Sequence, residues 1–294
     1  MLQQTQIKTV LPYFLRFVKR FPSIKKLARA NIRSILKKWE GLGYYSRAKN
    51  LHLASKIICK NYSERIPKKI DDLKLLPGVG DYTASIIMAV VNNKPYIAFD
   101  GNVKRVLKRF FALNIDDSSK NLKLLKHKSK VFLSKNRHGD LAQALMELGA
   151  LVCKPTNPKC NKCPLQKFCS FKKSNISFTK KIKKNNKLIY VALCNLRKNK
   201  VLVTNKNPSG FLNGMLTVPM IELKNFKKIN RKNNYEVLKK ELSHNISNSN
   251  LKIKIAILKK NINLPNHFWI DKNKIKKYPI PVLTKKIFKA INLS

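Results

Sequence analysis

“LPGVGDYTA”, residues 76–84, is the stretch that decides the fold of this 294-residue chain. Apolar side chains at helical spacing around it predict one helix that ends near Leu75 and a second that begins around Asp81. Gly78 and Gly80 allow backbone angles that other residues avoid, and they let a ligand come close to the main chain. The second helix would point its free N–H groups and its positive dipole end at that ligand. The pattern favours a helix–hairpin–helix that holds a DNA phosphate, although an ordinary turn is the simpler interpretation of these letters alone.

The helical pattern extends over residues 1 to about 172. Apolar residues recur three and four positions apart in “IKTVLPYFLRFVKRF”, “VKRVLKRFFAL” and “DLAQALMELGALVC”, and Pro or Gly marks the connections. No part of this region alternates like a strand. The sequence therefore predicts a mostly α region over 1–172.

The pattern changes in the last third of the chain. Residues 173–187 are polar and basic, which is typical of a linker, and beyond them “KLIYVALCNL”, “KVLVTNK” and “LKIKIAIL” are β-branched and alternating or continuously apolar. “VLTKKIFKAI” then returns to helical spacing. We expect residues 188–294 to form a separate α+β domain.

The charge balance points to a polyanionic partner. The chain has 63 Lys and Arg against 14 Asp and Glu, a net charge of +49. Such a chain binds nucleic acid readily. Mutational drift toward A/T-rich codons, which encode Lys, Asn and Ile, is an alternative source of part of this excess. No apolar run is long enough to span a bilayer.

Four of the six cysteines are clustered, whereas Cys59 and Cys194 are solitary. This distribution and the absence of a signal peptide favour a reducing cytosol over a disulfide framework. The clustered residues are Cys153, Cys160, Cys163 and Cys169, spaced C-x6-C-x2-C-x5-C. Zinc sites pair cysteines two and two, so one cysteine followed by a tight trio favours a 4Fe–4S cluster, with zinc as the alternative.

Asp100 directly precedes another predicted helix, in “FDGNVKRVLKR” (99–109). Its common role would be that of a helix N-cap. In a helix–hairpin–helix protein a carboxylate here could also face the deoxyribose of an extruded nucleotide and stabilise positive charge at C1′ as the base leaves.

These motifs together resemble the adenine DNA glycosylases of the MutY type, in the endonuclease III superfamily. “LQQTQIKTVLPYF”, “GLGYYSRAKNLH”, “LPGVGDYTA”, “DGNVKRVL” and the cysteine spacing are similar to that family. The resemblance implies a base-excision repair enzyme that hydrolyses the N-glycosidic bond of adenine opposite 8-oxoguanine or guanine. It also implies a six-helix module facing an iron–sulfur module, with DNA between them.

Tyr82 separates this chain from the lyase-type relatives. Those enzymes place a Lys at this position, and its amine attacks the sugar, but no Lys occurs here between Gly80 and Val91. Hydrolysis is therefore expected instead of a Schiff base, and the resemblance implies that Tyr82 hydrogen-bonds near the reaction centre. An endonuclease III-like glycosylase/lyase remains the alternative enzyme.

The resemblance also assigns residues that bind DNA. Gln4 and Tyr44 would insert into the base stack beside the oxidised guanine, which helps to offset the cost of unstacking. The amides of Gly78, Val79 and Gly80 would hold a phosphate.

Residues 188–294 resemble the family's Nudix-like domain, which recognises 8-oxoguanine. The glutamates of this region, Glu222, Glu236 and Glu241, are not arranged as a Nudix catalytic box. The domain is thus expected to recognise the lesion without a second activity. Ser243 and His244, in “LSH”, match the family's Phe-Ser-His recognition loop, with a Leu in place of the aromatic residue.

The first residues carry one further expectation. In the family, the helix that contains “MLQQT” starts earlier, and a catalytic Glu that protonates adenine lies two residues before this Met. The resemblance thus implies that this general acid is not among the 294 residues. A reading frame that starts upstream, a decaying gene and a chain that binds the lesion without cutting are the three explanations. The expected partner is double-stranded DNA, bound by a monomer in a bacterial cytoplasm, in association with the nucleoid.

Overall fold

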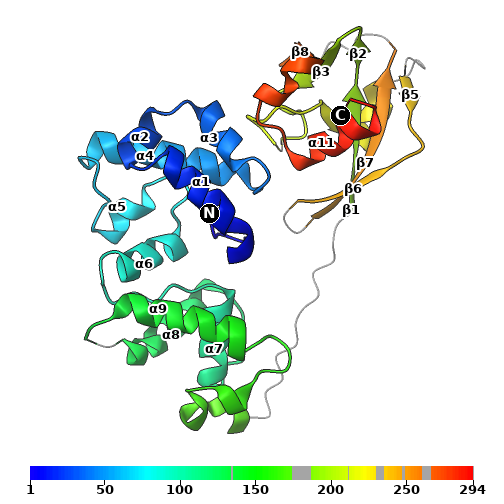
Figure 1. Cartoon of the computed structure of the whole chain (residues 1–294). Helices are drawn as coiled ribbons and strands as arrows, with labels where there is room; N and C mark the ends of the chain where they lie inside the picture. The colour runs from blue at the N-terminus through cyan, green and yellow to red at the C-terminus, as the bar shows by residue number, and fades with distance from the viewer. Residues whose placement is uncertain are drawn as a thin grey trace. The chain divides into compact units, whose positions relative to one another are not determined.

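The computed structural model of the chain describes residues 1–133, 135–173, 187–210, 212–229, 235–246, 249–259 and 266–293 (Figure 1). Apart from its two end residues, the predicted linker 173–187 lies outside these ranges. Contacts between Cα atoms group the chain into two compact units, Met1–His52 with Ile182–Ser294, and Leu53–Lys181. The first unit joins the N-terminal helices to the C-terminal domain, so this grouping cuts across the helical region predicted for 1–172.

The N-terminal part of the first unit is helical, as the periodicity predicts. Its helices are α1 (Ile7–Arg20), α2 (Ile24–Arg29), α3 (Ile32–Trp39) and α4 (Tyr45–Asn61), the last of which continues into the second unit. Side-chain oxygens of Ser23 and Asn31 cap α2 and α3, which fixes where these short helices begin. The apolar faces pack around Trp39, which is only 1% exposed.

A tight turn connects α3 to α4. Gly41 has a φ of +98°, and a Cβ at this position would lie 2.5 Å from the Tyr13 hydroxyl oxygen. The Trp39 indole N–H donates to the Gly43 carbonyl at 3.0 Å. Only glycine combines this backbone angle with the close approach of a side chain, so the “GLG” of the sequence is a requirement of the turn.

The second unit is also helical. It contains α5 (Ile70–Lys74), α6 (Asp81–Val90), α7 (Gly101–Phe110), α8 (Ser119–Ser129) and α9 (His138–Glu147), followed by a π-helical turn (Leu148–Val152) and short 3-10 turns that carry the clustered cysteines. Buried Val103, Leu107, Leu125 and Leu145 form one core that joins α7, α8 and α9. None of the helices within the described ranges is long and apolar enough to cross a membrane.

The C-terminal part of the first unit is an α+β domain, as predicted from the change of period. Its strands are β1 (Lys187–Cys194), β2 (Leu196–Arg197), β3 (Lys200–Thr204), β4 (Met220–Glu222), β5 (Tyr235–Val237), β6 (Leu242–Ile246), β7 (Ser249–Leu258) and β8 (His267–Asp271), and its helices are α10 (Leu223–Ile229) and α11 (Val282–Ala290). A five-stranded sheet has the order β4-β1-β7-β5, with β6 also paired to β7, and a three-stranded sheet has the order β2-β3-β8.

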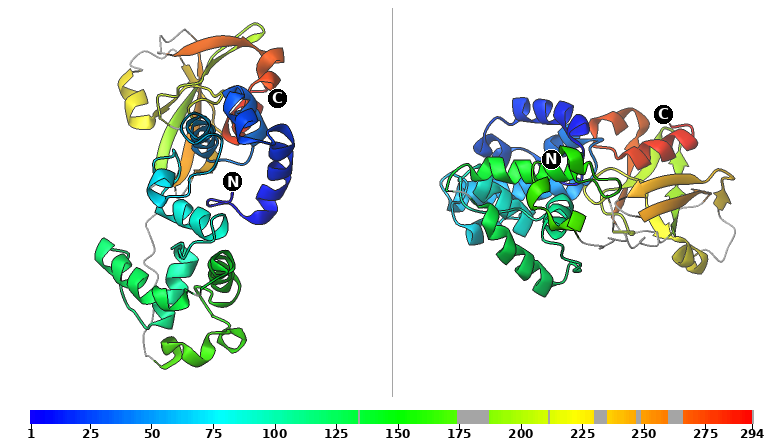
Figure 2. Two further views of the ribbon diagram at one scale, coloured as in Figure 1. Left: turned by 90° about the vertical axis from the view of Figure 1, so that its left-hand side faces the viewer. Right: turned by 90° about the horizontal axis from the view of Figure 1, so that it is seen from below.

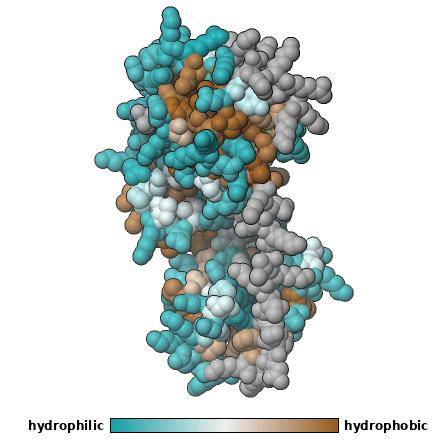
Figure 3. All heavy atoms as spheres, turned by 90° about the vertical axis from the view of Figure 1, so that its right-hand side faces the viewer, coloured by the Kyte–Doolittle hydropathy of each residue, from teal (hydrophilic) through white to brown (hydrophobic). Residues whose placement is uncertain are grey.

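The two sheets and α11 share one core (Figures 1 and 2). The central strands β1 and β7 are parallel, whereas the other pairs are antiparallel. Ile253 and Ile255 of β7 pack in this core with Leu283 and Ile287 of α11. Hydrophilic side chains cover much of the face shown in Figure 3, around an apolar area in the upper half.

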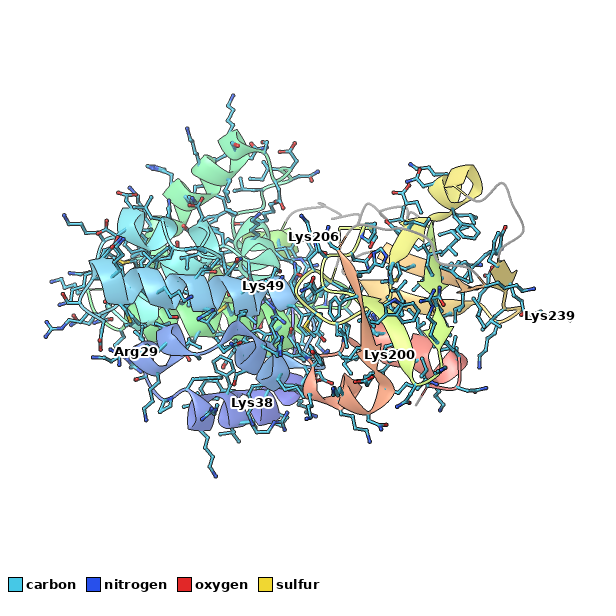
Figure 4. The ribbon with its side chains drawn as sticks, turned by 90° about the horizontal axis from the view of Figure 1, so that it is seen from above. Arg29, Lys38, Lys49, Lys200, Lys206 and Lys239 are labelled. Atoms are coloured by element: carbon cyan, nitrogen blue, oxygen red, sulfur yellow. The ribbon has the colours of Figure 1, made fainter. Side chains whose placement is uncertain are left out.

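The N-terminal helices and the C-terminal domain contact each other within the first unit. Met215, fully buried, packs in the core of α1 to α4. Lys49 of α4, labelled in Figure 4, donates to the Asn213 carbonyl. Glu40 forms ion pairs with Lys37 at 2.8 Å and with Lys285 at 2.5 Å. Although burial opposes it, these hydrogen bonds keep the pKa of Glu40 below its ordinary value, so the carboxylate stays charged at the contact.

Candidate active site and nucleic-acid interface

The hairpin lies where the sequence predicts it. Helix α5 ends at Lys74 and α6 begins at Asp81. Between them, Gly78 has a φ of +79°, and the amide of Val79 donates to the Leu76 carbonyl at 3.1 Å. The Val79 donor is therefore used within the turn, while Gly78 and Gly80 are exposed on the surface.

The start of α6 has no side-chain cap. Gly80 is its N-cap residue and has no side chain to accept from the first-turn amides. The only acidic group in this turn is Asp81, whose carboxylate forms an ion pair with Lys74 at 2.7 Å. A hydrogen bond from Lys74 holds the pKa of Asp81 below its ordinary value. An anion that approaches this helix terminus therefore meets a neutralised carboxylate and a positive dipole end.

Asp100 is the N-cap of α7. Its Oδ1 accepts from the Val103 amide at 2.7 Å, and its Oδ2 accepts from the Asn102 side-chain amide at 3.3 Å. The side chain is half-buried. The common capping role is thus present, and it holds the carboxylate in one orientation.

Tyr82, in the first turn of α6, lies within electrostatic range of Asp100. Burial, and after it the negative charge of Asp100, raises the pKa of the Tyr82 phenol above its ordinary value. The hydroxyl donates to the sulfur of Met146 at 3.2 Å. The second unit therefore brings together a fixed carboxylate and a neutral phenol.

The start of α7 is tied to the region that follows α9. Arg105 donates to the Asn102 side-chain oxygen at 2.8 Å and to the Gly149 carbonyl at 2.6 Å. A Cβ at Gly149 would lie 2.7 Å from the Cβ of Asn102. Gly149 thus permits close packing against the turn of α7 that carries Asp100.

The four clustered cysteines surround one pocket. Cys153, Cys160, Cys163 and Cys169 line it together with Arg109 and Phe171. Burial first, and then the neighbouring thiols, raises the pKa of Cys169 above that of an ordinary thiol, although the Phe171 amide opposes the shift. Within the described ranges, no three His, Cys, Asp or Glu side chains form a group that could hold a metal ion. Four thiols facing a common pocket are nevertheless a donor set that suits an iron–sulfur group.

Arg109 was not among the residues that the sequence singled out. Its guanidinium lies 3.4 Å from the Cys153 sulfur and donates to the carbonyls of Lys154 at 2.6 Å and Pro155 at 2.8 Å. The residue is only 5% exposed, and its guanidinium lies over the Phe171 ring. One signal was present, because Arg109 follows the buried Val106 by three positions and thus falls on the buried face of α7.

Gln4 and Tyr44 both belong to the first unit. Gln4 is exposed and Tyr44 is half-buried, and both have left-handed backbone conformations, with φ values of 57° and 48°. Arg47 contacts the residues next to each of them.

Ser243 and His244 lie on strand β6, not in a loop. Ser243 pairs with Lys252 of β7, and its hydroxyl bonds the side chain of Asn250 at 3.2 Å. Ser243 is exposed and His244 is half-buried. Burial, and then the charge of Lys286, lowers the pKa of His244, so the imidazole is held neutral.

The sequence of this chain is similar to those of known protein families. Residues 1–130 match the HhH-GPD superfamily of base excision DNA repair proteins. The adenine DNA glycosylase of Buchnera aphidicola subsp. Baizongia pistaciae is 35% identical over 94% of this chain and 78% of its own length. That of Buchnera aphidicola subsp. Schizaphis graminum is 40% identical over 60% of this chain, and about half of that relative (51%) is covered.

Two solved structures are similar to part of this chain. A thermostable thymine-DNA glycosylase has a TM-score of 0.52 and 27% identity over 58% of this chain and 80% of its own. An endonuclease III trapped on DNA has a TM-score of 0.50 and 24% identity over 58% of this chain and 79% of its own, which shows a shared fold. The chain therefore belongs to the adenine DNA glycosylase family, within the HhH-GPD superfamily of base excision DNA repair proteins.

Proposed function

We propose that this protein removes adenine opposite 8-oxoguanine or guanine from double-stranded DNA by hydrolysing the N-glycosidic bond. The observation that supports this most directly is a fixed Asp100 carboxylate that lies close enough to Tyr82, in the first turn of α6, to act on it electrostatically. Departure of a base leaves positive charge on the sugar, as in the cleavage of a glycoside. A carboxylate held by two hydrogen bonds is preorganised to stabilise that charge.

Asp100 and Tyr82 have separate roles in this proposal. Asp100 faces C1′ and stabilises the cation by its charge. Tyr82 is a neutral phenol whose pKa burial and Asp100 raise further. Its O–H donates to Met146 in the free protein and would turn to donate a hydrogen bond near the reacting sugar. No amine replaces it, which favours attack by water over a Schiff base.

DNA binding would use the hairpin and a wedge. The exposed glycines of the hairpin and the first turn of α6 hold a phosphate, a contact that carries no base specificity. Gln4 and Tyr44 enter the base stack beside the lesion, and the target adenine leaves the duplex.

The cysteine loop would hold a 4Fe–4S cluster. Cys153, Cys160, Cys163 and Cys169 supply its four thiolates, one set around one pocket. The cluster would fix the loop, and Arg109 would join that loop to α7 through Cys153 and the carbonyls beside it.

The C-terminal domain, residues 188–294, would recognise 8-oxoguanine as a Nudix-like domain without Nudix activity. Ser243 is exposed on β6 and could reach the edge of the lesion, with His244 beside it. The proposed domain organisation is a glycosylase region over 1–172, a linker over 173–187 and this domain.

The test is excision by the purified chain under single-turnover conditions. Duplexes with adenine opposite 8-oxoguanine, guanine or thymine are incubated with excess protein, and abasic sites are revealed with alkali. We expect release of adenine from the first two and none from the third. Lesion-specific binding without excision would replace this function with that of a non-cutting binding protein. Strand cleavage without alkali, together with borohydride trapping, would instead indicate a lyase.

A further inference from the structure

One guanidinium connects two segments that are far apart in the sequence. Arg47 lies in the first turn of α4. Its Nη1 donates to the carbonyls of Met1 and Gln3, each at 2.5 Å, and its Nη2 donates to the carbonyl of Gly43 at 3.3 Å. The side chain thus fastens the residue before Gln4 and the residue before Tyr44 to the same group.

Aromatic rings complete the surroundings of Arg47. The guanidinium lies over the Tyr44 ring at 5.1 Å from its centroid, and over the Trp39 ring at 5.6 Å. Its Nε is buried and makes no hydrogen bond. A flat cation that bonds three carbonyls and stacks on rings cannot be replaced by a lysine, whose ammonium is compact and strongly hydrated.

Gln4 and Tyr44, the residues that follow the Gln3 and Gly43 carbonyls bonded by Arg47, have unfavourable backbone conformations. Both residues have a left-handed backbone conformation, which residues other than glycine rarely adopt. Such conformations persist only where the surroundings impose them. The bonds to the Gln3 and Gly43 carbonyls act on the peptide groups directly before these two residues, so Arg47 is placed to impose both conformations.

We propose that Arg47 is the positioning residue of the DNA wedge and holds Gln4 and Tyr44 in their inserting conformations before DNA arrives. This inference rests on the proposed function, because it assumes that these two side chains enter the base stack. A wedge that is already ordered avoids the cost of ordering during binding. Its loss should therefore weaken lesion-specific unstacking more than general duplex affinity.

The test measures unstacking without chemistry. A duplex carries 8-oxoguanine opposite a 2′-fluoro-adenosine that resists excision, with 2-aminopurine as the next base. Wild-type protein should raise the fluorescence of 2-aminopurine. Arg47→Lys and Arg47→Ala should bind this duplex about tenfold more weakly, the size expected for a lost charge-assisted hydrogen bond, and should raise the fluorescence less. Affinity for an undamaged duplex should change little.

Controls separate positioning from charge and folding. Lys56 is exposed on the same helix, and Lys56→Ala should leave the fluorescence change intact while removing one positive charge. In a Tyr44→Ala background, Arg47→Ala should add little further loss, because both changes remove the same wedge. Thermal melts report folding, and Arg47→Lys keeps both the stem and the charge if Arg47→Ala melts early.

Two results would overturn the inference. If Arg47→Lys unstacked the duplex as well as wild type does, the planar guanidinium and its several donors would not be needed. Fully additive losses from Arg47→Ala and Tyr44→Ala would show that they act separately. If wild-type protein neither prefers the lesion duplex nor excises adenine from a cleavable one, the proposed function fails first. If it does both and the Arg47 variants match it, only the positioning role fails.

Discussion

Helices α6 and α7 of the second unit begin in opposite ways. At α6 the N-cap is Gly80, which has no side chain to bond the first-turn amides. At α7 the N-cap is Asp100, whose carboxylate accepts from the Val103 amide. Both helix starts have the same dipole and the same need for acceptors. The N-cap side chain meets this need at α7, whereas at α6 the N-cap residue supplies no side-chain acceptor.

Under the proposed function, this difference gives the α6 start a binding role and the α7 start a catalytic one. A phosphate is a diffuse partner that many DNA sequences supply, so an open terminus is sufficient. A charge that must face one sugar atom has to be held, and the cap holds it. The packing of Gly149 and Arg105 against the first turn of α7 restrains it further.

The largest expected effect is that of Asp100→Asn. Asn caps helices as well as Asp does, so the free energy of unfolding should stay within about 0.5 kcal/mol of wild type. The excision rate should fall by about 10²–10³-fold or more, because the charge that stabilises the cation is gone. Single-turnover excision and thermal melts measure the two effects. If Asp100→Asn were as active as wild type, Asp100 would be only the N-cap of α7 and would have no catalytic role.

The cysteine loop should support α7 more than α6. Cys160→Ser should lower the content of about four irons per chain and the brown colour of anaerobically purified protein. Excision should fall further than the affinity for undamaged duplex, since Arg109 joins the loop to α7. Cys59→Ser, at a solitary cysteine, is the matched control. Colourless wild-type protein with one zinc would contradict the cluster.

Gly149→Ala tests the packing against α7. The new Cβ would meet the Cβ and the backbone of Asn102, and overpacking of this kind costs about 1–3 kcal/mol. Gly101→Ala, in the first turn of α7 beside Asn102, is the control, because a Cβ there meets nothing within 4 Å. Denaturant unfolding should show a loss for the first variant only. Equal stabilities would mean that the α7 start is free to shift.

Gly78→Ala and Gly80→Ala examine the open start. Gly78 has a φ of +79°, so Ala should cost about 1–2 kcal/mol there. Gly80 has an ordinary φ of −92° and room for a Cβ, so Gly80→Ala should cost only its poorer N-capping, about 0.5–1 kcal/mol. For an undamaged duplex, the slope of the logarithm of the binding constant against the logarithm of the salt concentration should be smaller in magnitude by about one for Gly78→Ala. If the salt slope were unchanged in both variants, the hairpin would not be a phosphate-binding site.

The smallest expected effect links the two helices. Asp100 contributes to the raised pKa of Tyr82, so Tyr82 should ionise at lower pH in Asp100→Asn than in wild type. Because the folded pKa lies above the unfolded one, this phenol favours the folded state below the unfolded value, and that contribution disappears as pH rises through the folded pKa. Tyrosine-labelled NMR spectra, assigned with Tyr82→Phe, measure the shift. Identical titrations in the two proteins would show that Asp100 has no effect on the pKa of Tyr82.

Several features could be predicted because their signals are local. The hairpin glycines, the N-cap at Asp100 and the cysteine cluster at 153–169 are each short, continuous sequence motifs. The change from helical to alternating period likewise predicts the C-terminal α+β domain. The strand position of Ser243 and His244 could not be obtained from the match to a family loop, because register depends on the pairing of β6 with β7.

The sequence by itself determined that residues 1–172 are mostly helical and that an α+β region follows residue 187, where α6 and α7 begin and which cysteines belong together. Only the tertiary structure decided what those elements contact. Arg109 meets Cys153 across 44 residues, Arg47 meets Met1 across 46, and Met215 enters the core of the N-terminal helices. The physical reason is that caps, turns and periodicity arise from neighbours along the chain, whereas buried cations and packed side chains depend on partners that folding brings from far away.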